Sequence, residues 1–325
     1  MQHVLTTYVN CSLGGMTSVY RARAVHNPHT QFDQIFCVDR GGIEAYQDLP
    51  NLDMRLVNRD RLANYIKFAT KKIKYSDLRI TSMPELPAKI ENVDVGRVIY
   101  EFHSPDASII SRELEKLDPK AIDEVWTPSD WCSDLVDSLR PNRMHFPIRT
   151  VPNLVDTRFF NDRGVNARLP RSNEFIPVSW IGRLENTQKN YLDFLRTLRG
   201  LPENYYGLMI YSFENNPDRI QKFLGDAAAL GVLDRIEIFS DVPQPTVSDI
   251  HRAVRDAGGV FYSTSLLESF GYAVLEAALC GCPVVSYDVG PLRQHPVSGV
   301  TFVDVGDIPS AVEAIASQAA ALKVP

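Results

Sequence analysis

Short apolar runs recur along most of the chain and alternate with longer segments whose apolar residues repeat at helical spacing. Several runs are continuously apolar rather than alternating, which is typical of strands covered on both faces. Strand–helix–strand repetition favours right-handed crossovers and a parallel sheet. The pattern predicts strands at residues 3–9, 34–38, 54–57, 78–82, 97–102, 124–127, 149–151, 176–181, 207–211, 235–239, 259–262, 283–287 and 300–303.

This pattern is interrupted between residues 152 and 175, where the sequence PNLVDTRFFNDRGVNARLPRSNEF is polar and has no sustained period. Such a segment is typical of an interdomain linker. The length of 325 residues also exceeds what one hydrophobic core usually spans. We therefore expect two doubly wound α/β domains, at residues 1–155 and 174–325.

Composition and charge narrow the class of protein. A hydrophobic fraction of 44% with 23% charged residues indicates a soluble globular chain, and the net charge of −6 argues against a nucleic-acid partner. The N-terminus lacks the pattern of a signal peptide, and an odd count of five cysteines favours a reduced, cytoplasmic protein. Cys280 and Cys282 have no second Cys/His pair nearby, so we expect them to be small packing residues rather than zinc ligands.

The most informative segment is ESFGYAVLEAALCGCPVV, which begins at Glu268. We expect a strand to end near residue 262, then a loop, then a helix over 270–280 that Gly281 terminates. Ligands of open parallel sheets bind at the carboxyl ends of strands, and Gly271 allows a ligand to approach the backbone there. The first N–H groups of the helix suit a phosphate or a sugar hydroxyl, and Glu276 can accept hydrogen bonds from a ribose diol. The alternative for Glu276 is an exposed helix residue.

A second segment, WIGRLENTQKN, follows the first strand expected in the second domain and places Arg183 and Lys189 at its tip. An isolated Arg/Lys pair is more often a solvated surface feature. Beside the Glu268 segment, we instead expect the two cations to face a ligand. The chain contains no Asp-x-Asp pair of the kind that can hold a divalent metal.

The complete run from Glu268 to Glu276 resembles the Glu-x7-Glu signature of retaining glycosyltransferases of the GT-B fold, family 4 (glycosyl transferases group 1). The resemblance implies two Rossmann-like domains that face a central cleft. It also implies transfer of a hexosyl unit from a nucleoside diphosphate sugar, without a metal and with retention of configuration. In this family Arg183 and Lys189 would bind the donor diphosphate, and Glu276 would bind the ribose. The sugar would be held by Glu268 with Ser269, Phe270, Gly271 and Tyr272.

The first domain resembles the family less specifically. The segment NCSLGGMT, with Gly14 and Gly15, resembles the glycine loop that faces the donor phosphates, although a tight turn explains it equally well. His103 stands near a family histidine that contacts the reacting sugar; the alternative is a structural hydrogen-bonding role. Asn153 lies in VPNLVD, where this chain has Leu154 in place of the family's glycine.

Residues 55–79 form a basic stretch with eight Lys/Arg and two acidic residues. Apolar residues recur there at helical spacing, so the segment is either a surface helix packed on its sheet or a basic amphipathic helix that docks on anionic lipid. The second alternative would place the protein at the inner face of the membrane. No pattern indicates an oligomeric state.

Donor and acceptor are less defined than the reaction class. We expect a UDP-sugar, with GDP-mannose as the alternative, and a glycan, lipid-linked or small-molecule acceptor. The rival functions are a non-catalytic nucleotide-sugar-binding partner protein and a sugar-nucleotide epimerase. Leu154 favours the former rival, as does a given sequence that ends with VEAIASQAAALKVP, where family members usually continue into a crossover helix.

Overall fold

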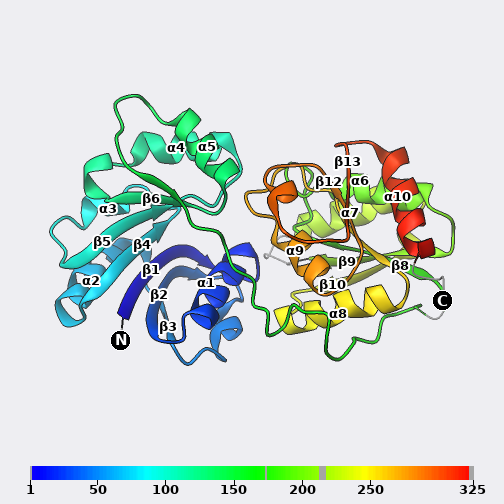
Figure 1. Ribbon diagram of the computed structural model, residues 1–325, viewed down its shortest axis with the longest axis horizontal. Coiled ribbons are helices and arrows are strands. Elements are labelled where there is room, and N and C mark those ends of the chain that lie inside the picture. The colour runs from blue at the N-terminus through cyan, green and yellow to red at the C-terminus, as the bar shows by residue number, and fades with distance from the viewer. Residues whose placement is uncertain (1, 173, 212–216, 322–325) are drawn as a thin grey trace. The chain divides into compact units, whose positions relative to one another are not determined.

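The computed structural model describes residues 2–172, 174–211 and 217–321. The chain divides into two compact units, Met1–Asp156 and Thr157–Pro325. Each unit is built on one sheet in which all paired strands are parallel (Figure 1). This arrangement confirms the prediction of two doubly wound, Rossmann-like sheets.

Unit 1 contains a 7-stranded sheet with the order β3-β2-β1-β4-β5-β6-β7, here called sheet A. Its strands are β1 (Gln2–Cys11), β2 (Thr30–Asp39), β3 (Leu52–Leu56), β4 (Tyr75–Thr81), β5 (Val95–Glu101), β6 (Glu124–Thr127) and β7 (Ile148–Thr150). Its α-helices are α1 (Gly15–His26), α2 (Arg59–Lys72), α3 (Leu86–Lys89), α4 (Ala107–Lys116) and α5 (Asp130–Leu139).

The two faces of sheet A carry different side chains because successive strand residues point to opposite sides. One face is apolar, and residues of α2, α4 and α5 pack on it together with Leu78, Ile80 and Tyr100. The other face includes Asp77, Thr81 and Glu101, to which α1 contributes polar contacts. Ser129 caps α5 by accepting a hydrogen bond from the backbone N–H of Cys132.

Unit 2 contains a 6-stranded sheet with the order β10-β9-β8-β11-β12-β13, here called sheet B. Its strands are β8 (Ile176–Ile181), β9 (Tyr205–Tyr211), β10 (Ile236–Ser240), β11 (Val260–Ser263), β12 (Val284–Tyr287) and β13 (Val300–Val303). Its α-helices are α6 (Tyr191–Gly200), α7 (Pro217–Ala229), α8 (Gln244–Asp256), α9 (Tyr272–Leu279) and α10 (Ile308–Ala321). Residues of α6, α7 and α10 pack in one core cluster, and those of α8 and α9 in another.

The segment expected as a linker packs against unit 2 over residues 157–172. Phe160 and Leu169 are buried, at 1% and 7% exposure. The Arg252 guanidinium of α8 donates hydrogen bonds to the carbonyls of Phe159 and Asn161, both at 3.0 Å. This segment is therefore an ordered outer layer of unit 2.

No helix within the described ranges has the length and apolar character needed to cross a bilayer.

Candidate functional site

The candidate site in unit 2 lies where the strand order of sheet B reverses direction. β8 pairs with both β9 and β11, so the chain leaves this point toward both edges of the sheet. The loops after β8 and β11, residues 182–190 and 264–271, follow the carboxyl ends of these adjacent strands. In open parallel sheets this position is where ligands bind.

Lys189 and Glu268 from these two loops form an ion pair. The Lys189 ammonium donates to Glu268 Oε1 at 2.6 Å and to Ser265 Oγ at 3.4 Å. The side chains are only 19% and 11% exposed. An ammonium has three donors, and acceptors among the described residues take two of them, which leaves one for a ligand oxygen. The structure therefore brings together two residues that the sequence singled out separately.

The loop that carries Lys189 is organised by Glu185, which the sequence analysis did not single out. The Glu185 carboxylate accepts hydrogen bonds from the backbone N–H groups of Thr187, Gln188 and Lys189, at 2.8, 2.9 and 2.7 Å. Burial alone would raise the pKa of Glu185, but these hydrogen bonds and that of the Thr187 hydroxyl lower it. The ionised carboxylate thus stabilises the loop. In the sequence, the only indication of this role was that Glu185 is an acidic residue two positions after Arg183.

Gln188 joins the two loops. Its side chain accepts from the exposed Arg183 guanidinium and donates to the Leu267 carbonyl at 3.2 Å. Its backbone carbonyl accepts from the N–H of Leu266 at 2.7 Å. Arg183 is thereby held beside the loop that carries Glu268.

Gly271 ends the second loop and precedes α9. Its φ of +87° lies in the left-handed region, and a Cβ there would collide with Leu292. The helix begins at Tyr272 rather than at residue 270 because Gly271 is not helical. Glu276, within α9, is 6% exposed, which contradicts the alternative of an exposed helix residue. Ser269 and Phe270 lie between Glu268 and this turn, and Phe270 is buried.

The unit 1 residues predicted for the site lie at the start of a helix or just after the end of a strand. Gly14 is the N-cap of α1, Gly15 is its first residue, and a Cβ on Gly14 would meet no described atom within 4 Å. Asn153 follows β7 and is 9% exposed, and its Oδ1 has no hydrogen-bond partner among the described residues. His103 follows β5, and its Nε2 lies 3.2 Å from Glu101 Oε2. That these residues contact the donor stays a prediction.

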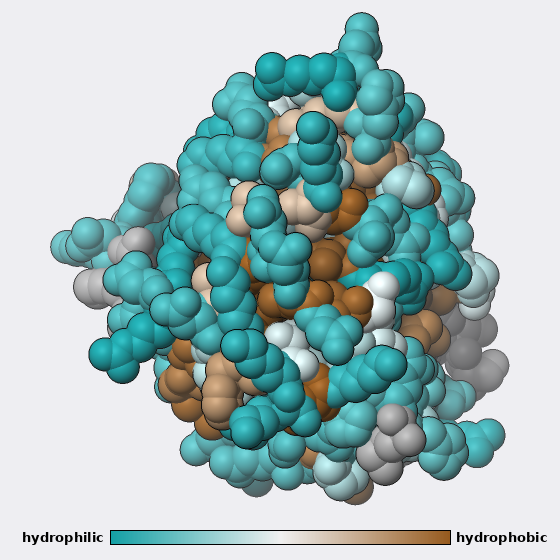
Figure 2. Space-filling view, turned by 90° about the vertical axis from the view of Figure 1, so that its left-hand side faces the viewer, coloured by the Kyte–Doolittle hydropathy of each residue, from teal (hydrophilic) through white to brown (hydrophobic). Residues whose placement is uncertain are grey.

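Unit 1 also contains a cavity of about 490 Å³ that is separate from these predicted site residues. It is lined by Ile90, Val93 and Val95 among others, and includes the residues that precede β5 and β6. Figure 2 views this end of the unit and shows apolar side chains surrounded by polar ones. The cavity is thus at the amino-terminal edge of sheet A, opposite to Glu101 and His103, and we do not assign the donor to it.

Within the described residues, no group of three or more His, Cys, Asp or Glu side chains is arranged to hold a metal ion. The five cysteines are free thiols, and Cys280 and Cys282 are buried. Burial raises the pKa of the Cys280 thiol to about 12, consistent with a packing role.

The sequence of unit 2 matches a known family. Residues 177–320 fit the family model "Glycosyl transferases group 1". This range includes Arg183, Lys189, Glu268 and Glu276, whereas Gly14, Gly15, His103 and Asn153 lie outside it.

Curated relatives align with part of the chain. The D-inositol 3-phosphate glycosyltransferase of Thermobispora bispora is 40% identical over 77 residues, which cover 23% of this chain and 17% of that protein. The enzyme of the same name from Acidothermus cellulolyticus is 27% identical over 186 residues, covering 53% of this chain and 39% of that protein. These alignments span well under two-thirds of either relative.

Solved structures align with nearly the whole chain. The Anabaena protein HepE, in complex with UDP and glucose, has a TM-score of 0.75 at 12% identity, covering 99% of this chain and 92% of its own. The sucrose-phosphate synthase of Thermosynechococcus elongatus has a TM-score of 0.74 at 15% identity, with coverage of 99% and 90%. The chain has the GT-B fold. The two sheets described above are the Rossmann-like sheets of that GT-B fold.

Proposed function

We propose that this protein is a retaining, metal-independent glycosyltransferase that moves a hexosyl unit from a nucleoside diphosphate sugar to an acceptor hydroxyl. The observation that carries the proposal is the Lys189–Glu268 pair at the strand-order reversal of sheet B. The pair lies within the range that matches the glycosyltransferase family model. A non-catalytic binding partner or an epimerase remains as the rival to be tested.

In the proposed reaction, the bond between the anomeric carbon and the diphosphate oxygen breaks as the acceptor oxygen attacks from the same face. The acceptor proton passes to the departing phosphate oxygen. Lys189 and Arg183 stabilise the charge that develops on the diphosphate. Glu268 with the backbone of Ser269 to Tyr272 holds the sugar, and Glu276 holds the ribose.

Unit 1 contributes the remaining donor contacts in this proposal. Gly14 and Gly15 allow the backbone to approach the phosphates, Asn153 offers its unpartnered Oδ1, and His103 contacts the sugar beside the reacting carbon. We assign no carboxylate as a covalent nucleophile.

A UDP-sugar is our preferred donor, and GDP-mannose is the alternative. The preference is supported by the fold neighbour HepE, whose structure contains UDP and glucose. The curated relatives suggest a first acceptor, because those from both organisms are named for inositol 3-phosphate. A phosphorylated polyol should therefore be tried beside glycan and lipid-linked acceptors.

We also propose that α2 brings the protein to anionic membranes. Leu62, Ile66 and Ala69 are buried against sheet A, whereas Phe68 is 59% exposed on the opposite side. Exposed basic residues surround Phe68 in the sequence and on the helix: Arg61, Lys67, Lys71 and Lys72. An apolar side chain among cations suits the interface of an anionic bilayer.

A thermal-shift series with UDP, GDP, ADP and their sugar conjugates, with EDTA present, tests the donor proposal. A ligand at 100 times its dissociation constant adds about 2.7 kcal/mol of stability. We expect one base family to raise the melting temperature despite EDTA. If none of them does, the donor proposal is wrong. If binding requires added metal, metal independence is wrong.

Product analysis then separates the rivals. Without an acceptor, an epimerase makes a new nucleotide-sugar, whereas a transferase at most hydrolyses the donor slowly. With inositol 3-phosphate and other acceptors supplied, binding without any product would favour the non-catalytic partner.

A further inference from the structure

Glu101 is a fully buried carboxylate at the carboxyl end of β5, with a side chain that is 0% exposed. A buried charge is tolerated only where charges and hydrogen bonds compensate it. Glu101 meets this condition through partners from three elements, and one of these partners is His103.

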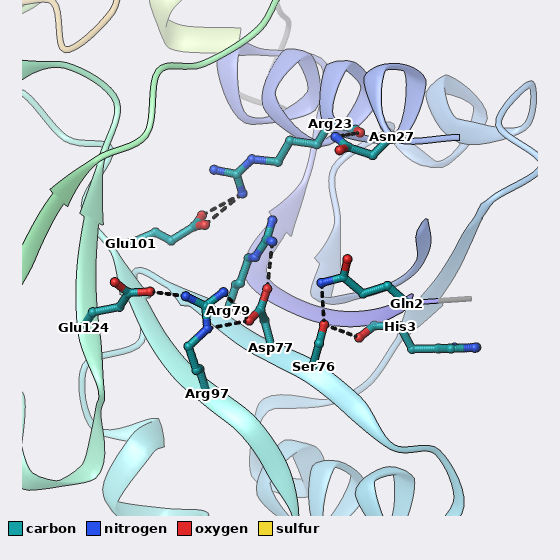
Figure 3. A network of polar contacts seen from close by, with 10 residues as sticks. All are labelled: Gln2, His3, Arg23, Asn27, Ser76, Asp77, Arg79, Arg97, Glu101 and Glu124. Atoms are coloured by element: carbon teal, nitrogen blue, oxygen red, sulfur yellow. Dashed lines mark hydrogen bonds and ion pairs between the residues drawn. The ribbon is translucent and has the colours of Figure 1, made fainter. Parts of the chain in front are cut away.

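The first partner is Arg23 of α1. Its Nη1 donates to both carboxylate oxygens of Glu101, at 2.8 and 3.0 Å (Figure 3). Thr81 of β4, which is in register with Glu101, donates its hydroxyl to Oε2 at 3.4 Å. Burial alone would raise the pKa of Glu101, but Arg23, His103 and Arg79 together hold it well below its usual range. The carboxylate is therefore ionised and fixed in place.

The remaining contact joins Glu101 to His103. Residues two apart on an extended chain face the same side, and this places the imidazole beside the carboxylate. His103 Nε2 lies 3.2 Å from Glu101 Oε2, with the His103 side chain 11% exposed. An ionised carboxylate only accepts hydrogen bonds, so Nε2 of His103 carries a proton that it donates to Glu101.

We propose that Glu101, anchored by Arg23, is a positioning residue that fixes the orientation and the proton of His103 for contact with the donor sugar. The inference rests on the proposed function, because it takes His103 as a donor contact. Arg23 lies on the helix that starts at Gly15, so the same helix links the predicted phosphate-facing turn to the histidine.

Other carboxylates on this face of sheet A provide a contrast. Asp77 and Glu124 bind Arg97 at 2.8 and 2.7 Å (Figure 3). Among the described residues, the ion pairs of Asp77 and Glu124 are formed with arginines, whereas His103 pairs with Glu101. A substitution of Glu124 therefore disturbs the charge balance of the same face without touching the histidine, and Glu124→Gln is the matched control.

The test combines kinetics with a signal from the ring itself. In Glu101→Gln we expect kcat to fall about ten- to hundredfold, with a smaller change in KM for the nucleotide-sugar. Glu124→Gln should keep wild-type kcat. In a His103→Ala background, Glu101→Gln should cause no further loss of kcat, because residues that act through one group are not additive.

Spectra of protein with 15N-labelled histidine give a readout that needs no activity. The Nε2–H proton of His103, assigned by its loss in His103→Ala, should be a protected, downfield signal in the wild type and should be absent in Glu101→Gln. If Glu101→Gln does not fold, Glu101→Asp takes its place. This variant keeps the charge opposite Arg23 but withdraws the carboxylate by one methylene, and it should also lose the signal.

Three outcomes would overturn the proposal: an unchanged signal in the folded variant, additive losses of kcat in the double variant, or full activity of His103→Ala. A wild type that transfers no sugar would instead overturn the proposed function, while the ring signal would still decide whether Glu101 positions His103.

Discussion

The Lys189 ammonium and the Glu268 carboxylate are 2.6 Å apart, although 79 positions separate them in the sequence. Each residue comes from the loop that follows one of two adjacent strands, β8 and β11. Removing one partner of a largely buried pair leaves the other charge uncompensated. The two residues should therefore behave as a unit in stability as well as in turnover.

Lys189→Ala should lower kcat by about 10²–10³, the range found when one group that stabilises a developing anion is removed. It should also lower the free energy of unfolding, and adding Glu268→Gln should recover part of that stability without recovering kcat. Steady-state kinetics and urea unfolding measure both effects. Lys222→Ala is the control, since Lys222 forms an ion pair with Asp226 on an exposed helix surface. Unchanged turnover in Lys189→Ala would remove this residue from the mechanism.

Glu185 should make donor affinity depend on pH. Its folded pKa is lowered, so its stabilisation of the loop is present above the ordinary glutamate pKa, about 4.3, and is lost as pH falls through the lowered value. Donor titrations from pH 7 down to pH 3 should show the wild-type affinity holding to about pH 4.3 and falling only below it, as pH passes through the lowered pKa of Glu185. Glu185→Gln should bind weakly at neutral pH, with less further change. Equal affinity of the two proteins at pH 7 would contradict this role.

Gly271→Ala should lower the free energy of unfolding by about 1–3 kcal/mol, because the residue adopts a left-handed conformation and its Cβ would collide with Leu292. Donor affinity should fall as well, since the turn sets the start of α9. Gly225→Ala, at an exposed position of α7, is the control: its Cβ would meet no described atom within 4 Å. That change should be neutral or stabilising by up to about 1 kcal/mol. Similar losses in both variants would show that the turn has no special requirement.

Co-sedimentation with anionic vesicles tests the membrane proposal. The wild type should pellet at low salt and be released at high salt, because surface charges are then screened. Phe68→Ala and Lys67→Glu should each reduce the pelleted fraction. Val165→Ala removes apolar surface from a residue that is 79% exposed in unit 2 and should have no effect. No pelleting of the wild type at low salt would end the idea.

The hydrophobic pattern predicted the strands closely where an apolar run and a strand coincide. The predicted ranges 124–127, 176–181 and 300–303 match β6, β8 and β13 to the residue. β2 begins at Thr30, earlier than predicted. Thr30 and Gln31 are polar, so the hydrophobic pattern does not include them, but they join β1 through backbone pairing. Backbone pairing leaves no mark on side-chain hydropathy.

The site residues could be predicted because they belong to a sequence motif. The residues that support them could be identified only in the structure. Glu185 and Glu101 are single acidic residues in sequence and look like surface positions. Their roles depend on which backbone N–H groups and guanidinium surround them after folding, and this depends on strand order and loop path. A pattern along one chain contains no such information about neighbours from other elements.

The packing of residues 157–172 on α8 has a practical consequence for domain dissection and chimaeras. A fragment that starts at residue 174 would lose Phe160 and Leu169 and leave the Arg252 guanidinium without its carbonyl acceptors. A fragment that starts at residue 157 keeps this layer. Domain exchange between GT-B proteins should accordingly join the chains at the Asp156–Thr157 peptide, so that each recombined half retains the residues that seal its own core.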